Sequence, residues 1–267
     1  MGEASERPDA SQGHPREWPS TPYSDEARAA EPPMDVASCI ALIGDCTVCC
    51  DYLPPANRPE SHLAVRLRRA FPGQPFVIRN RSDNGGTARG FLEMGGVDGL
   101  FAAMPRLHVA FLRFGVNDRK RDGVAACVRY LALLCERLRG RYPQLAIVIE
   151  TGLWVDYPDH YMWDRNARLA LLYDAMRSMS REAGCELLDI FDMTRAEVER
   201  GNWDLRVRGL PDPKHTIVDG SFDGFFGDDP AFFTNIHPNS RCLGLIAEWR
   251  VEKLVELFGG RLPGAVV

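Results

Sequence analysis

The chain has 267 residues, of which 45% are hydrophobic, 26% charged and 9% aromatic. This composition is typical of a globular protein and excludes a coiled coil, a collagen-like fibre and a wholly disordered chain. The net charge of −5 argues against a nucleic-acid partner, because such binders usually carry a basic face. No apolar run reaches the roughly 18 residues of a membrane helix, so no membrane partner is expected.

The first 35 residues differ in composition from the rest. Residues 1–35 are rich in Pro, Ser, Glu and Ala and lack apolar periodicity, which predicts a disordered leader. Residues 36–267 show no second shift in composition, so we expect a single domain. The leader has no apolar stretch typical of a secretory signal. We therefore expect a cytoplasmic protein whose eight cysteines are mostly free thiols.

Short apolar runs and longer stretches of helical spacing alternate along the domain. In chain order, the pattern predicts a strand at Val36–Gly44, a helix at Pro59–Phe71, a strand at Pro75–Arg79, a helix at Gly90–Met104, a strand at Leu107–Phe114, a helix at Asp122–Tyr142, a strand at Leu145–Glu150, a helix at Tyr161–Ala183, a strand at Glu186–Phe191, a short helix near Thr194–Arg200 and a last helix at Ser240–Phe258. Residues 202–236 are expected to be irregular and are rich in aromatic side chains.

Strands that alternate with helices indicate an α/β fold with a parallel sheet and helices on both faces. Five such strands fit a three-layer, flavodoxin-like α/β/α sandwich with strand order 2-1-3-4-5. In that order strands 1 and 3 are neighbours whose connections leave in opposite directions. A crevice is therefore expected at their carboxyl ends, where the following turns would carry the functional residues.

Four polar blocks stand at those positions. Gly44-Asp45-Cys46 follows the first strand, Asn80–Gly86 the second and Gly115-Val116-Asn117-Asp118 the third, and Thr234-Asn235-Ile236-His237 precedes the last helix. In this order the blocks resemble the motifs of the SGNH (GDSL-type) hydrolase superfamily, over residues 38–258. Two positions depart from that pattern, since Cys46 stands where the family has its nucleophilic serine and Thr234 where it has its catalytic aspartate.

The resemblance implies a role for each block. Cys46 would be the nucleophile, His237 the base, and Gly85 (rather than Gly86) and Asn117 the donors of an oxyanion hole. A thiol is far more acidic than a hydroxyl, and a helix N-terminus is expected to lower its pKa further. A Cys–His pair therefore depends less on a third carboxylate, and Thr234 could orient His237 by a hydrogen bond.

The implied reaction is acyl transfer through a Cys46 thioester. Water as acceptor would make the protein an esterase or thioesterase, and an alcohol or amine would make it an acyltransferase. A small acyl substrate, free or carrier-bound, is the expected partner, and no metal or cofactor is expected. The aromatic residues Trp154, Tyr157, Phe226 and Phe233 are candidates for the substrate pocket, although such residues also pin loops onto a domain.

Other interpretations of the same residues stay open. Exchange of the serine for cysteine also fits a weak or inactive SGNH-fold protein that only binds a ligand, or an engineered residue. Cys46 and Cys49 are spaced as in a thiol redox turn, which likewise opens a helix after a strand.

Overall fold

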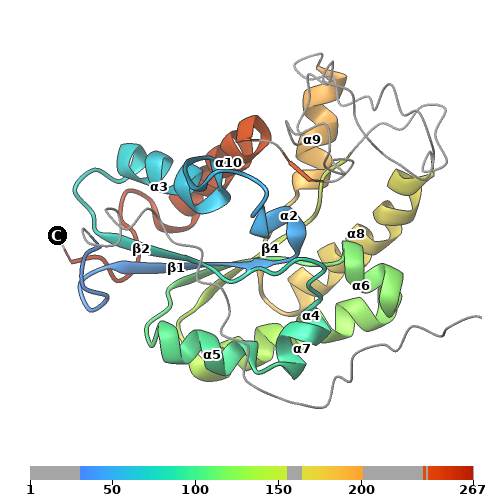
Figure 1. Cartoon of the computed structure of the whole chain (residues 1–267), viewed down its shortest axis with the longest axis horizontal. Helices are drawn as coiled ribbons and strands as arrows, with labels where there is room; N and C mark the ends of the chain where they lie inside the picture. The colour runs from blue at the N-terminus through green and yellow to red at the C-terminus, as the bar shows by residue number, and fades with distance from the viewer. Residues whose placement is uncertain (1–30, 155–163, 201–236, 239, 267) are drawn as a thin grey trace, which may run out of the picture.

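The sheet has the predicted strands and order. The structure, a computed structural model, describes residues 31–154, 164–200, 237–238 and 240–266. Its five parallel strands run in the order β2-β1-β3-β4-β5. They are β1 (Ser38–Gly44), β2 (Phe76–Asn80), β3 (Val109–Arg113), β4 (Ala146–Glu150) and β5 (Glu186–Leu188). The predicted α/β/α fold is therefore confirmed (Figure 1).

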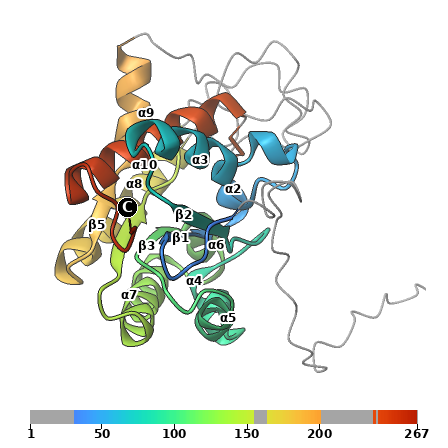
Figure 2. The ribbon, with the colours of Figure 1, turned by 90° about the vertical axis from the view of Figure 1, so that its left-hand side faces the viewer.

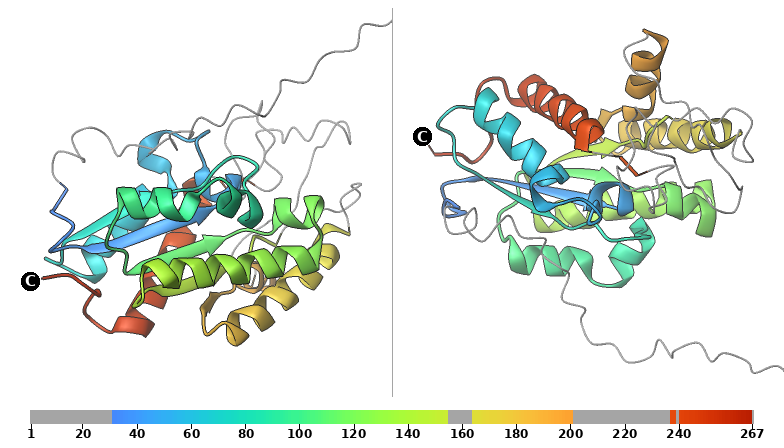
Figure 3. Two further views of the ribbon diagram at one scale, coloured as in Figure 1. Left: turned by 90° about the horizontal axis from the view of Figure 1, so that it is seen from below. Right: turned by 45° about the horizontal axis from the view of Figure 1, so that its top comes forward.

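Helices cover both faces of the sheet because the strands are apolar on both sides. α3 (Pro59–Ala70) and α10 (Ser240–Phe258) pack together on one face. The other face carries α4 (Ala88–Glu93), α5 (Gly96–Ala103), α7 (Val124–Arg141) and α8 (Arg165–Glu182). Figure 2 shows the two layers on either side of the sheet, and the left panel of Figure 3 shows α5, α7 and α8 in front of it.

The alternation of side chains along β1 divides the core between these faces. Cys39, Ala41 and Ile43 join the cluster under α4, α5, α7 and α8. Ile40 and Leu42 join the cluster under α3 and α10. The whole of β1 is buried, as expected for an inner strand of a parallel sheet.

Several helix boundaries differ from the predicted ones. The helix expected at Gly90–Met104 is two helices, α4 and α5, separated by Gly95 in the left-handed conformation at φ 71°. The turn after β3 is already helical, forming α6 (Val116–Arg121) ahead of α7. The strand expected at Glu186–Phe191 stops at Leu188, because Asp189 caps α9 (Ile190–Glu199) by accepting from the Asp192 N–H.

Two short helices, α2 (Cys46–Cys49) and the 3-10 helix η1 (Pro55–Asn57), complete the described elements. No helix within the described ranges combines the length and apolar character needed to cross a bilayer.

Candidate active site

The first motif lies in the turn between β1 and α2. A Cβ atom on Gly44 would collide with the carbonyl oxygen of Arg113 on β3, so this close approach requires glycine. Asp45 caps α2, since its carboxylate accepts hydrogen bonds from the Thr47 N–H at 2.9 Å and the Thr47 hydroxyl at 2.8 Å. Cys46 is thereby fixed as the first residue of α2, with its side chain half-buried.

The loop after β2 is bound to the end of β1. The Asp83 N–H donates to the Gly44 carbonyl oxygen at 3.1 Å. A Cβ on Gly86 would lie 2.9 Å from the Asp83 oxygen and 3.0 Å from the Gly44 oxygen. Gly85 adopts a φ of 68°, which is open to glycine at little cost. Both glycines are therefore required by the local backbone, and they hold this loop against the turn that carries Cys46.

The third motif starts α6 and is fixed by two side chains. The Asn117 amide nitrogen donates to the Gly86 carbonyl oxygen at 3.1 Å. The Asp118 carboxylate accepts from the Gly115 N–H at 3.0 Å and from the Ala88 N–H at 2.8 Å. Burial raises the pKa of Asp118 to about 6, although these donors oppose the rise. Asp118 thus ties the turn after β3 to the start of α4.

Burial and nearby donors act in opposite directions on the pKa of the Cys46 thiol. Burial first, and then the neighbouring Asp45, raises the pKa of the Cys46 thiol to about 11. Hydrogen bonds from the Gly85 N–H, from the Asn117 side chain and from the Cys46 N–H itself oppose that rise. The lowered pKa that the sequence suggested is therefore wrong. α2 has only four residues and its first turn is capped by a carboxylate, so its dipole does not offset the loss of water.

Tyr52, six residues after Cys46, contacts His237. The Tyr52 ring meets the His237 ring edge-on, with 5.7 Å between centroids. The Tyr52 hydroxyl donates to the Pro238 carbonyl oxygen at 2.5 Å and also lies 3.5 Å from the Cys50 sulfur. Burial raises the pKa of Tyr52, and the thiols of Cys50 and Cys46 are among the further causes. Sequence reasoning missed Tyr52, which has no motif around it.

A buried ion-pair network joins β3, β4 and α10 and contacts α2. Glu150, at the end of β4, accepts from Arg250 of α10 at 2.6 and 2.8 Å and pairs with Arg113 of β3 at 2.8 Å. All three side chains are at most 2% exposed. Arg113 also donates to the Thr47 carbonyl oxygen at 3.4 Å, so the network reaches α2 directly. Sequence analysis did not find it, because its members come from three distant elements.

The predicted pocket residues are only partly described. Trp154 packs against both core clusters, and its backbone N–H donates to the Thr194 hydroxyl at 3.1 Å. These contacts fit the anchoring role of an aromatic residue at least as well as a role in a pocket. The other site predictions, Thr234, Tyr157, Phe226 and Phe233, lie outside the described residues.

The redox interpretation finds no support in the thiols. Burial and then Asp51 raise the pKa of Cys49 to about 12. A redox turn needs a thiol of lowered pKa, whereas both Cys46 and Cys49 have raised ones. Among the described residues, no group of three or more His, Cys, Asp or Glu side chains could hold a metal ion.

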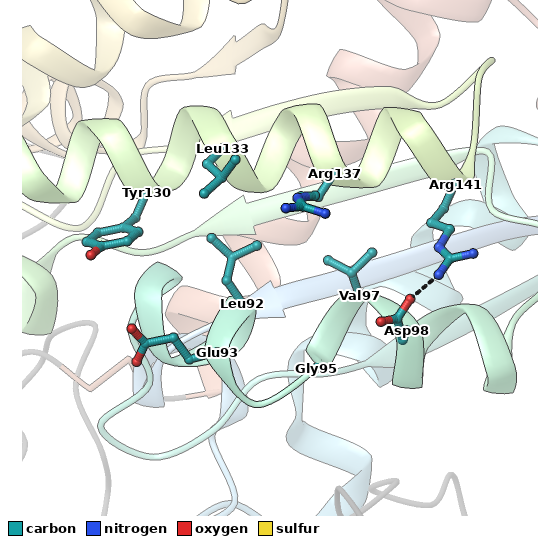
Figure 4. Close-up of a pocket in the computed structure, with 9 residues that line it drawn as sticks. All are labelled: Leu92, Glu93, Gly95, Val97, Asp98, Tyr130, Leu133, Arg137 and Arg141. Atoms are coloured by element: carbon teal, nitrogen blue, oxygen red, sulfur yellow. Dashed lines mark hydrogen bonds and ion pairs between the residues drawn. The ribbon is translucent and has the colours of Figure 1, made fainter.

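A separate groove lies between α4, α5 and α7, on the face of the sheet away from α3 and α10 (Figure 4). It is lined by Leu92, Glu93, Gly95, Val97, Asp98, Tyr130, Leu133, Arg137 and Arg141. None of these residues belongs to the four motifs, so the groove is not part of the candidate active site.

Comparison with known proteins agrees with this fold. A family model described as the GDSL-like lipase/acylhydrolase family matches residues 42–241. No curated protein sequence matches the chain.

Solved structures with the same fold are distant in sequence. Protein YXIM of Bacillus subtilis is 17% identical, with a TM-score of 0.58, over 84% of this chain and 58% of that longer chain. A lipase/acylhydrolase from Enterococcus faecalis is 13% identical, with a TM-score of 0.57, over 82% and 96% of the two chains. Axe2, an acetylxylan esterase from Geobacillus stearothermophilus, is 12% identical, with a TM-score of 0.56, over 82% and 95%.

Proposed function

Because the chain belongs to the GDSL-like lipase/acylhydrolase family, we propose that it transfers acyl groups through a thioester on Cys46. His237 acts as the general base, and Gly85 and Asn117 form the oxyanion hole. The observation that carries this proposal is the convergence of the Gly85 N–H and the Asn117 amide on the Cys46 sulfur. Donors that can reach the sulfur can also reach a carbonyl oxygen bound beside it.

The raised pKa of Cys46 decides how the thiol must react. With a pKa of about 11, only about one thiol in 10⁴ is ionised at pH 7. The resting site therefore holds a neutral thiol, and His237 has to remove the proton as the sulfur attacks. This is general-base catalysis, in contrast to the resting thiolate–imidazolium pair of many cysteine enzymes.

The steps follow from these roles. The Cys46 sulfur bonds to the acyl carbon as its proton passes to His237, and the carbonyl oxygen takes up the negative charge. When the tetrahedral species collapses, the leaving alcohol or thiol takes the proton from His237 and a thioester remains on Cys46. Water, an alcohol or an amine then attacks that thioester, with His237 again accepting the proton of the acceptor. The bond between the acyl carbon and the sulfur breaks, the product leaves, and the Cys46 sulfur takes the proton back from His237, which restores the thiol.

One hydrogen of the Asn117 amide holds the group in place, so that the other can serve the oxyanion. One N–H donates to the Gly86 carbonyl oxygen at 3.1 Å, which leaves the other for the sulfur or the substrate oxygen. A single such donor contributes typically about 3 kcal/mol to the transition state. Thr234 takes the position of the family's aspartate, and we propose that its hydroxyl orients His237.

Intact mass spectrometry tests the proposal. The protein is incubated with para-nitrophenyl acetate, and we expect an acetyl adduct that Cys46→Ala removes while Cys49→Ala keeps it. His237→Ala should slow acylation at least about 10²-fold, whereas Thr234→Ala should have a much smaller effect. Folding of each variant is checked by circular dichroism.

The alternatives give different results. No adduct on a folded protein would favour a ligand-binding protein without catalysis. A Cys46–Cys49 disulfide under mild oxidation, with no acylation, would favour the redox function. If Thr234→Ala were as damaging as His237→Ala, a thiol mechanism that tolerates loss of the carboxylate would be wrong.

A further inference from the structure

One arginine of α6 lies beside the proposed oxyanion hole. Arg121 lies one helical turn after Asn117 and therefore on the same face of α6. One of its guanidinium nitrogens, Nη2, lies 3.3 Å from the position that a Cβ on Gly85 would occupy. The guanidinium of Arg121 thus stands next to the residue whose N–H reaches the Cys46 sulfur.

Three further arginines lie toward α8, namely Arg119 on another face of α6 than Arg121, and Arg165 and Arg168 in the first turn of α8. Burial, and then the charges of Arg168 and Arg165, lowers the pKa of Arg119, which shows that the three lie near one another. Figure 1 shows α6 beside the start of α8, and the left panel of Figure 3 shows the same pair from below. We call Arg119, Arg121, Arg165 and Arg168 the arginine rim.

The carboxylates of the described residues neutralise only part of the rim. Asp164 pairs with Arg168 at 2.6 Å, and the Asp45 carboxylate feels the charge of Arg165. Within the described ranges, by contrast, Arg121 is exposed and makes no ion pair, and the Nε atom of Arg119 is buried without a hydrogen-bond acceptor. The buried donor of Arg119 is costly unless an acceptor completes it.

Carboxylates lie on the same loop. Asp83 stands two residues before Gly85, and Asp51 accepts from the Asn84 amide at 2.7 Å. Both carboxylates raise the pKa of Cys49. An anion near Gly85 therefore depends on Arg121 for a favourable charge.

We propose that the arginine rim, and Arg121 above all, selects acyl donors that carry a carboxylate or phosphate close to the reacting carbonyl. The proposal rests on acyl transfer at Cys46 and adds a substrate class to it. Guanidinium groups bind either anion through paired N–H donors, so the same geometry serves both. An anion seated at Arg121 lies beside the oxyanion donors, which places the reacting carbonyl over the Cys46 sulfur.

Alkylation of Cys46 tests the rim without any need for catalysis. Iodoacetate and iodoacetamide react by the same displacement and differ in charge. The ratio of the iodoacetate rate to the iodoacetamide rate therefore reports the local potential, while the thiol pKa cancels. The ratio at Cys46 is read by tandem mass spectrometry and normalised to the urea-unfolded chain. We expect a normalised ratio of at least about 5, which falls in 0.5 M NaCl.

Variants assign the effect to the rim. Arg121→Ala should lower the ratio at Cys46 about 3-fold and Arg121→Glu about 10-fold, whereas Arg121→Lys should stay within about 2-fold of wild type. Arg137→Ala is the matched control, because it removes the same charge from the distant groove on α7 (Figure 4). Cys49, beside Asp51 and Asp83, should show the opposite preference in the same molecule.

Ester pairs then locate the anion within the substrate. Para-nitrophenyl hemisuccinate against para-nitrophenyl butyrate tests a charge on the acyl group. 4-Acetoxybenzenesulfonate against phenyl acetate, each normalised to spontaneous hydrolysis, tests a charge on the leaving group. In one of the two pairs the anionic ester should have at least about 10-fold higher kcat/KM, and Arg121→Ala should remove most of that preference.

The outcomes separate the two proposals. A ratio near 1 at Cys46, or one that Arg121→Glu leaves unchanged, overturns the arginine rim even if esters are turned over. Preference for the neutral ester in both pairs overturns the rim as well. A high, Arg121-dependent alkylation ratio without any acyl adduct keeps the anion site and overturns acyl transfer.

Discussion

Glu150→Gln tests the buried network beneath the nucleophile turn. The substitution keeps the shape of the side chain but removes the charge that lies between two guanidiniums, at 2.6 to 2.8 Å. Removing one partner of a buried ion pair typically costs about 3–5 kcal/mol, because the remaining charges stay buried. For a chain of this size we expect Tm to fall by roughly 10 °C. Thermal and urea unfolding measure the change.

The pH dependence of this effect has a definite sign. Burial alone would raise the pKa of Glu150, but Arg113 and Arg250 outweigh it, so the pKa lies below its usual value. The folded state therefore gains stability from Glu150 above the pKa of the unfolded chain and loses it as the pH falls through the lower, folded pKa. The gap between wild type and Glu150→Gln should narrow accordingly in acid.

A surface ion pair supplies the control. Glu248 pairs with Arg66 at 2.9 Å but is 54% exposed, so Glu248→Gln should cost less than about 1 kcal/mol. The triple variant Arg113→Met, Glu150→Leu and Arg250→Met replaces the whole network by apolar side chains and should recover much of the stability. Acyl transfer should nevertheless be slower than in wild type in that triple variant, because the Arg113 hydrogen bond to α2 is lost. If Glu150→Gln unfolded like Glu248→Gln, the network would have no structural role.

Three shorter predictions concern the site itself. Cys46→Ser should lower the rate of para-nitrophenyl acetate cleavage at least about 10²-fold, since a hydroxyl needs the carboxylate that Thr234 replaces; a serine variant of equal rate would contradict the thiol mechanism. Burial raises the pKa of Asp118 to about 6, so its contribution to stability falls as the pH rises through that value. Relative to Asp118→Asn, wild type should lose up to about 3 kcal/mol between pH 4 and 7 in urea unfolding; an unchanged difference would refute the raised pKa. Gly86→Ala should destabilise the protein by about 1–3 kcal/mol and slow acylation, because its Cβ would press on two backbone oxygens at 2.9 and 3.0 Å. The control Gly99→Ala, with no atom within 4 Å of its Cβ, should be neutral or slightly stabilising, and equal effects of the two would refute the steric argument.

The secondary structure was most predictable where one strong pattern acted alone. The stripe of apolar residues in α7 and the buried run in β1 both specified their elements from sequence. The break between α4 and α5 was missed because apolar spacing continues through Gly95, whose left-handed conformation appears only in three dimensions. α6 was missed because Asn117 and Asp118 are typical turn residues, and only the Asp118 hydrogen bonds show how the helix starts.

The direction of the Cys46 pKa shift could not be predicted from the local sequence. The sequence places Cys46 at a helix N-terminus, which by itself favours the thiolate. How much water the surrounding elements leave around the sulfur depends on the loops after β2 and β3, and this loss of water dominates. Desolvation is a property of the packed structure, so no motif could have indicated the sign of the shift.

The sequence alone determined the α/β class, the strand order and the identity of the motif residues, because periodicity and turn chemistry are local. The tertiary structure decided which donors meet at Cys46, that Glu150 holds two arginines beneath it, and that Arg121 stands at Gly85. These relations join residues from strands and helices far apart in the chain. Their distances follow from how the sheet and its helices pack, and packing depends on all of the contacts at once.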